Sequence, residues 1–302
     1  MIRRLKKDFK RYKGLYLLVF PVVLYYLIFR YAPMGGAVIA FQNYRPALGI
    51  WKSEWVGFQH FKDFFSSFYF ERVVGNTLRL SLTNLVFGFP APIVLALLMN
   101  ELKDGAFKRV VQTVSYLPHF ISLVIICAMV REFVSTNGFV TQFLVNVFGI
   151  EKISLLTNKK FYIPIYAISG IWTNVGFNSI IYLAALSGVN MDLYDAAAID
   201  GAGRFKQTLH VTLPGIAPTI IIKLLLQIGY IMSIGHEKTL LLYNDGILET
   251  ADIISTYVYR KGLLNAELSY STAIDMFNSG INFLLIIIAN KISKKVSEVS
   301  LW

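Results

Sequence analysis

The side chains that usually carry catalysis are sparse and scattered in this sequence. The four histidines lie far apart, with no His-x-x-x-His or Glu-x-x-His pair of the kind that binds a metal ion. The single cysteine, Cys127, rules out an intrachain disulfide and a cysteine-based metal site. Neither a Gly-rich phosphate loop nor a Gly-x-Ser-x-Gly elbow occurs. We therefore expect no catalytic residue, no metal and no cofactor in this chain, and no ATP hydrolysis by it.

Polar side chains do form stripes inside long apolar segments, where they could bind a hydroxyl-rich ligand. Amide and hydroxyl groups can hydrogen-bond such a ligand, and aromatic faces can pack on its C–H surfaces. Helical spacing places most members of each stripe on one helix face. The candidates are Trp172, Asn174, Asn178 and Tyr182, then Lys223, Gln227 and Tyr230, then Asp275, Asn278 and Asn282, with Asn84 as a weaker member. Each could instead make an interhelical hydrogen bond, worth about 1 kcal/mol.

The composition is that of a membrane protein. Apolar residues make up 55% of the 302 residues and charged residues 16%, against about 25% charged in soluble domains. Part of the formal charge of +11 comes from lysines and arginines within residues 1–13, directly before an apolar run. This is the positive-inside signature of a cytoplasmic N-terminus. No basic stripe interleaved with aromatic residues predicts a nucleic-acid partner. Pro21 and nearby tyrosines favour a retained signal-anchor helix over a cleaved signal peptide.

Six apolar segments are long enough to cross about 30 Å of hydrocarbon. They lie near 15–32, 76–99, 113–134, 162–186, 214–235 and 273–291. The segments that we place inside, 1–13, 100–112, 187–213 and the tail from Ile292, are together richer in lysine and arginine than the outer segments, which are longer overall. We therefore predict an all-α membrane protein with a single domain over 1–302, six transmembrane helices, and both termini in the cytoplasm. A helix in the second half of 34–72 and a helical cap in 135–161 are expected outside.

The stretch 194–218, YDAAAIDGAGRFKQTLHVTLPGIAP, is helical in pattern but too polar to lie in lipid. Asn190 can cap a first short helix by accepting backbone N–H groups. Gly201 and Gly203 favour a sharp bend, because glycine can adopt a positive φ. A second short helix, 204–211, should end before Pro214, which suits the first turn of a new helix. The pattern predicts two bent helices on the inner membrane surface, although an ordinary interfacial helix–turn–helix would show it too.

This stretch resembles the EAA…G………LP loop of permease subunits of bacterial ABC importers. Asp195-Ala196-Ala197 matches EAA, with an aspartate for the usual glutamate, and Gly201 and Leu213-Pro214 follow. The resemblance implies a type I ABC importer permease fold, in which the loop 187–213 is a coupling helix that docks into a groove of the ATPase. Asp195 would then pair with a basic residue of the ATPase, and Arg204 would anchor the bend. The implied coupling residues are Asp195, Ala196, Ala197, Asp200, Gly201, Ala202, Gly203, Arg204 and Pro214.

Further segments resemble the polysaccharide-type branch of the carbohydrate permeases, which is similar to the maltose permeases and common in Gram-positive bacteria. They are GFPAP at 88–92, YLPHFIS at 116–122, WVGF at 55–58, ETADIISTYVYR at 249–260 and ANKIS at 289–293. The resemblance implies a multi-pass protein of the bacterial plasma membrane that imports oligosaccharides. Its partners would be a second homologous permease, two cytoplasmic ATPase subunits that bind ATP and Mg, a lipid-anchored extracellular solute-binding protein, and membrane lipid.

Two alternatives remain at this point: an ion-coupled secondary sugar transporter, and an ABC permease for a non-sugar solute. An ion-coupled transporter would need intramembrane carboxylates, and only Asp275 is a candidate. Lys223 lies near the bilayer centre, where an unpaired cation costs at least about 2.5 kcal/mol. How Lys223 avoids this cost bears on the nature of the solute. Its side chain could snorkel to the inner surface, or it could meet a carboxylate of an acidic oligosaccharide such as a uronate-containing fragment.

Overall fold

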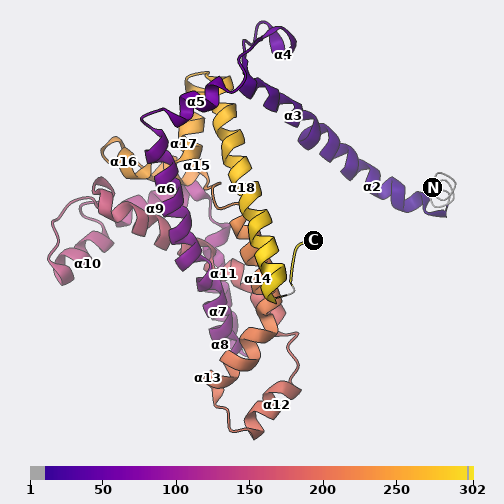
Figure 1. Cartoon of the computed structure of the whole chain (residues 1–302). Coiled ribbons are helices and arrows are strands. Elements are labelled where there is room, and N and C mark those ends of the chain that lie inside the picture. Colours follow the sequence, from indigo (N-terminus) through magenta and orange to yellow (C-terminus); the bar gives the residue numbers. More distant parts are fainter. Residues whose placement is uncertain (1–10, 298) are drawn as a thin grey trace. The chain divides into compact units, whose positions relative to one another are not determined.

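The computed structural model describes residues 11–297 and 299–302, which are mostly helical (Figure 1). They divide into two compact units. Unit 1 comprises the chain up to Ser66 together with Arg260–Met276, and unit 2 comprises Ser67–Tyr259 with Phe277–Trp302. The helix α18 (Leu268–Ser297) contributes to both units. The single domain over 1–302 stays a prediction.

Unit 1 begins with a long apolar helix. Lys13–Phe41 is continuously helical through α2 (Lys13–Tyr26), a π-helical turn (Leu27–Tyr31), α3 (Ala32–Met34) and a 3₁₀ turn (Gly35–Phe41). This helix contains the predicted span 15–32, and none of the residues of α2 is buried. The basic residues among the first ten lie outside the described residues.

The segment of unit 1 that follows the long helix contains a short β-ladder, which the all-α prediction lacks. β1 (Gln42–Asn43) pairs antiparallel with β2 (Glu54–Trp55), and α4 (Gly49–Lys52) lies between them. The ring of Trp55 stacks on that of Phe41 at 5.7 Å, which holds the two strands together. The helix expected in the second half of 34–72 is present as α5 (Gln59–Phe65), with Phe64 buried.

Unit 2 begins with a second long helix. Phe70–Asn100 runs through α6 (Phe70–Thr83), a π-helical turn (Asn84–Gly88) and α7 (Pro90–Asn100), and it contains the predicted span 76–99. The π-helical turn lies directly before Pro90. Its wider hydrogen-bonding ring allows the helix to pass a proline, which has no backbone N–H to donate.

The predicted span 113–134 is not one straight helix. It corresponds to α8 (Ala106–Tyr116) with the 3₁₀ turn Leu117–Phe120, followed by α9 (Leu123–Phe133), and the two parts are bent by 102°. Ile121 between them is extended, with φ −82° and ψ 137°. Pro118 lies in the last turn before the bend, where the missing N–H weakens the helix. The expected outer cap follows as α10 (Phe139–Phe148).

The helix α11 (Lys159–Leu186) is the packing centre of unit 2. It contains the predicted span 162–186 and packs most extensively against α7, with α8 and α14 also alongside. Gly176 permits a close approach to α8, because a Cβ there would clash with the backbone carbonyl of Ser115. The Gly, Ser, Thr and Asn residues of α11 lower its mean hydropathy. Within the described residues, α11 is therefore not among the helices that are long and apolar enough to span a membrane. These are Lys13–Phe41, Phe70–Asn100, Arg204–Ile228 and Leu268–Ser297, with the bent pair as a fifth.

The inner loop differs from the prediction at its second helix. After α12 (Asp192–Ile199), the chain continues without a break from α13 (Arg204–Gln207) through a π-helical turn (Thr208–Thr212) into α14 (Leu213–Ile228). The predicted end of the helix before Pro214 therefore does not occur. Again a π-helical turn lies directly before the proline and accommodates its missing donor.

The helix α14 ends at Ile228, short of the predicted 235. Residues 229–235 are not helical, and Asn282 of α18 supplies hydrogen bonds that the helix no longer provides. Its Oδ1 accepts from the N–H of Met232 at 2.9 Å, and its amide donates to Ser233 Oγ at 2.8 Å. The chain then forms α15 (His236–Leu242), a 3₁₀ turn (Asp245–Ile247), α16 (Leu248–Ala251) and α17 (Ile254–Tyr259), and a π-helical turn (Arg260–Leu264) leads to α18.

Two apolar clusters stabilise unit 2. One joins α6, α9, α11 and the α15–α16 segment through buried residues such as Leu80, Ile126 and Leu242. The other joins α7, α11 and α14 through Ile93, Tyr182 and Ile216. Burial of each large side chain contributes about 1.5 to 3 kcal/mol relative to exposure to water.

Candidate transport cavity and coupling loop

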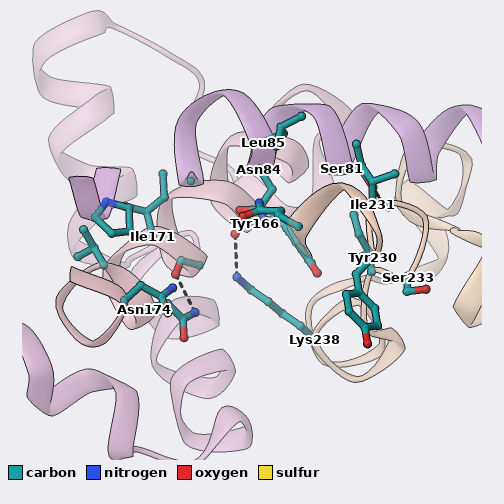
Figure 2. A pocket seen from close by; sticks show the side chains of 18 residues that line it. Ser81, Asn84, Leu85, Tyr166, Ile171, Asn174, Tyr230, Ile231, Ser233 and Lys238 are labelled. Carbon is teal, nitrogen blue, oxygen red and sulfur yellow. Dashed lines mark hydrogen bonds between the residues drawn. The ribbon is translucent and has the colours of Figure 1, made fainter. Parts of the chain in front are cut away.

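A cavity of about 390 Å³ lies inside unit 2, between residues of α6, α11, α14 and α15 and the non-helical segment 229–235. Its walls carry hydroxyl and amide groups together with tyrosine rings (Figure 2). The polar or aromatic lining residues are Ser81, Asn84, Tyr166, Asn174, Asn178, Gln227, Tyr230, Ser233 and Lys238. This is the mixture of groups that a hydroxyl-rich ligand requires.

The structure brings together five of the predicted path residues. Asn174 and Asn178 of α11, Gln227 of α14, Tyr230 beyond its end and Asn84 of the π-helical turn all line this cavity. Asn174 is held in place on both sides of its amide. Its Nδ2 donates to the carbonyl of Gly170 at 3.0 Å, and its Oδ1 lies 3.1 Å from Nδ1 of His119.

The remaining predicted path residues do not line this cavity. Tyr182 is buried in the α7–α11–α14 cluster, and Trp172 is 41% exposed. Lys223 is half-buried on α14, while Asn278 and Asn282 are buried on α18. Asp275 belongs to unit 1. A path role for these residues remains a prediction.

Lys238 is the charged group of the cavity, and the sequence interpretation did not single it out. Its Nζ donates to the backbone carbonyl of Tyr166 at 2.7 Å and lies 4.3 Å from the centroid of the Tyr166 ring (Figure 2). Gly170 leaves room for it, because a Cβ there would lie 3.1 Å from Nζ. The helix α15 lies outside the candidate spans, and desolvation lowers the pKa of the Lys238 ammonium from its ordinary value to about 8. No ion pair joins Lys238 to a carboxylate in the part of the chain that the structure describes.

The inner loop forms a sharp turn around one glycine. Gly201 has φ +76°, the left-handed conformation that L side chains rarely adopt, whereas Gly203 has φ −70° and ψ 167°. The N–H of Ala202 donates to the carbonyl of Ala197 at 2.9 Å across this turn. As predicted, Asn190 caps the start of the loop: its Oδ1 accepts from the N–H of Asp192 at 3.0 Å.

Two side-chain contacts brace the loop against the helix that follows it. The hydroxyl groups of Tyr194 on α12 and Thr212 in the π-helical turn are 2.9 Å apart. The amide of Gln207 donates to the carbonyl of Ala202 at 3.1 Å. In Figure 1, α12 and α13 lie at the end of unit 2 that is remote from α15, α16 and α17. These two hydrogen bonds join α12 and the Gly201 turn to the helical segment that leads into α14.

The loop also exposes apolar side chains that the sequence interpretation did not use. Ile199 is 87% exposed and Phe205 is 82% exposed, one on each side of the Gly201 turn. Leu193 is exposed too. Asp195, Asp200 and Arg204 are likewise exposed, and Arg204 Nη1 lies 3.4 Å from Glu101 Oε2 in the preceding inner segment. Large apolar side chains that protrude beside charges are typical of a surface that binds another protein.

Among residues 11–297 and 299–302, no group of three His, Cys, Asp or Glu side chains is arranged to hold a metal ion.

Comparison with known proteins identifies the family. Residues 88–243, which include the cavity-lining parts of α11, α14 and α15 and the whole loop 187–213, match the model of the binding-protein-dependent transport system inner membrane component family. The chain belongs to this family. It is therefore a multi-pass transport subunit of the plasma membrane without catalytic activity of its own. The family match also removes the alternative of an ion-coupled secondary transporter.

Several similar proteins match this chain over nearly its full length. Protein LplB of Bacillus subtilis is 44% identical over 294 residues, which cover 97% of this chain and 92% of that protein. The polygalacturonan/rhamnogalacturonan transport system permease protein YteP of Bacillus subtilis is 43% identical, covering 96% and 90%. A chain in the crystal structure of a bacterial alginate ABC transporter, in complex with an alginate pentasaccharide-bound periplasmic protein, is 41% identical. It has a TM-score of 0.90 and covers 99% of this chain and 100% of that one.

Proposed function

We propose that this chain is one of two permease subunits of an ATP-driven importer for acidic, uronate-containing oligosaccharides. Two similar proteins are named or described as transporting acidic polysaccharides, polygalacturonan/rhamnogalacturonan and alginate. The observation that carries the proposal within this chain is the cavity of unit 2. It combines hydroxyl and amide groups for sugar hydroxyls, tyrosine rings for the apolar faces of sugar rings, and one cation.

The proposed topology has six spans with both termini in the cytoplasm. The bent pair α8–α9 would be the third span and α11 the fourth. Two ion pairs support the assignment, because each joins segments that we place on the same side of the membrane. Arg204 pairs with Glu101 across the inner segments, and Lys159 pairs with Glu249 across the outer ones. Lys159 also holds the pKa of Glu249 below its usual range.

The proposed coupling element is the loop 187–213. ATP and Mg bind to partner ATPase subunits, whose closure shifts the loop within its groove. Ile199 and Phe205 would enter that groove, Asp195 would pair with a basic residue of the ATPase, and Ala196, Ala197 and Ala202 would allow close packing. Because α13 continues into α14 without a break, a shift of the loop moves α14, which lines the cavity. Access to the cavity would switch between the two sides of the membrane as a result.

Reconstitution tests this function. The chain is placed in proteoliposomes either alone or with its second permease, its ATPase subunits and the extracellular solute-binding protein, and uptake of labelled trigalacturonate is measured. Uptake is expected only from the complete complex, with ATP and with loaded binding protein. Uptake by the chain alone, or uptake by the complex that is independent of ATP, would refute the proposal. A complex that imports a neutral oligosaccharide but no trigalacturonate would refute the substrate class alone.

A further inference from the structure

The ammonium group of Lys238 lies in the wall of the cavity, where no carboxylate is paired with it in the described part of the chain. Moving an ammonium out of water is costly unless it is paired. Lys238 has a carbonyl dipole and an aromatic ring as partners, at 2.7 Å and 4.3 Å. A cation–π contact is weak beside a full ion pair. These two contacts hold the ammonium in place without neutralising its charge.

The surroundings of Lys238 favour a ligand as the missing counterion. The polar groups that line the cavity with it are neutral: the amides of Asn84, Asn174, Asn178 and Gln227, and hydroxyl groups. The Nζ of Lys238 can donate three hydrogen bonds, and the carbonyl of Tyr166 accepts one of them. An anion in the cavity could accept a second hydrogen bond from Nζ, and this bond would be strong because both groups are charged.

We propose that Lys238 determines the specificity of this cavity, and that its ammonium binds a carboxylate of the acidic oligosaccharide as the sugar passes. This inference rests on the proposed function and assigns the recognition of charge to one residue. The amide of Asn174, held by His119 and Gly170, lines the same cavity and is available to sugar hydroxyls.

The test removes charge from the residue and from the ligand independently. Lys238→Met removes the cation, Lys238→Gln removes the charge but keeps a hydrogen-bond donor, and Lys238→Arg keeps the charge. The probes are trigalacturonate and its fully methyl-esterified form, which has the same rings without carboxylates. Each variant is assayed in the complete reconstituted complex. The ratio of variant to parent uptake cancels any preference of the binding protein for one probe.

The expected result is selective. Lys238→Met and Lys238→Gln reduce the uptake of trigalacturonate at subsaturating concentration by about ten-fold or more, since a hydrogen bond to a charged group is worth about 1.5 to 3 kcal/mol. Uptake of the methyl ester stays within about two-fold of the parent, and Lys238→Arg retains most of the trigalacturonate uptake. Lys294→Met, which removes a lysine from the exposed end of α18, serves as the matched control and leaves both probes unchanged.

Three results would overturn the inference. Equal losses for both probes would mean that Lys238 only ties α15 to α11. Unchanged uptake of trigalacturonate would mean that its charge is not recognised here. Selective loss in Lys223→Met and not in Lys238→Met would assign the contact to α14. If the parent complex imports the ester and no trigalacturonate, the proposed substrate class itself fails. The two failures are thus distinguishable.

Discussion

Replacing Gly201 by alanine tests whether the coupling loop depends on its backbone turn. Gly201 has φ +76°, and a Cβ at this position would meet no atom within 4 Å. The cost is therefore one of backbone conformation and not of a clash. For an L residue in the left-handed region it amounts to about 1 to 2 kcal/mol. This corresponds to about 5- to 30-fold in any equilibrium that requires the turn.

The chain offers two matched controls for this substitution. Gly203→Ala adds the same methyl group two positions away, where φ is −70° and the space around the Cβ is also open. Because Gly203 is itself one of the implied coupling residues, this variant reports on close approach of the ATPase with the turn left intact, and it should impair docking less than Gly201→Ala does. Gly201→Asn places a residue that tolerates the left-handed region better than alanine does, and should recover most of the loss.

The assay titrates purified ATPase subunits into proteoliposomes that contain both permeases, with loaded binding protein present. The ATPase concentration that gives half-maximal stimulated hydrolysis is expected to rise for Gly201→Ala, by up to about 5- to 30-fold, because only the fraction of loops with the native turn is competent to dock. The amount of permease in the membrane is measured in parallel. Parent-like titration by Gly201→Ala would refute the reasoning. Equal impairment by Gly203→Ala would show that close approach of the ATPase, and not the turn, is what matters.

Two further predictions concern the cavity and the packing around it. Lys238 is charged below its pKa of about 8 and neutral above it, so the uptake ratio of trigalacturonate to its methyl ester should fall as the pH rises from about 7 to about 9. Lys238→Arg should abolish that fall, and a ratio independent of pH in the parent would contradict the prediction. Gly176→Ala should lower the melting temperature in detergent, because its Cβ would clash with the Ser115 carbonyl and overpacking costs about 1 to 3 kcal/mol. Gly75→Ala, with open space around its Cβ, should not lower it.

Much of the fold follows from local sequence pattern. Long apolar runs indicated the helices Lys13–Phe41, Phe70–Asn100 and Leu268–Ser297, because a segment that spans a bilayer must satisfy its backbone hydrogen bonds internally. The turn at Gly201 and the cap at Asn190 were also predictable, since both depend on residues that are near in sequence. The family could also be recognised from the sequence, because its loop motif is a short linear pattern. The family match confirmed it.

Where helices bend or continue was less predictable. A proline removes one hydrogen bond wherever it occurs, but its neighbours decide the outcome. Near Pro118 the helix ends, and α9 follows at an angle of 102° to α8. Before Pro214, in contrast, a π-helical turn connects α13 to α14 in one continuous helix. The end of α14 at Ile228 likewise depends on Asn282, which is 50 or more residues away in sequence and caps the non-helical segment.

The sequence by itself determined that this is a helical membrane subunit with a polar inner loop, because hydropathy, charge asymmetry and a contiguous motif are all local properties. Only the tertiary structure decided which polar side chains share a cavity. Asn174 and Gln227 meet there, while Tyr182 of the same stripe is buried in an apolar cluster. The sequence interpretation missed Lys238 because it lies in a short helix, α15, outside the apolar runs. Its importance depends on Tyr166 and Gly170 of α11, which its side chain reaches only in the folded structure.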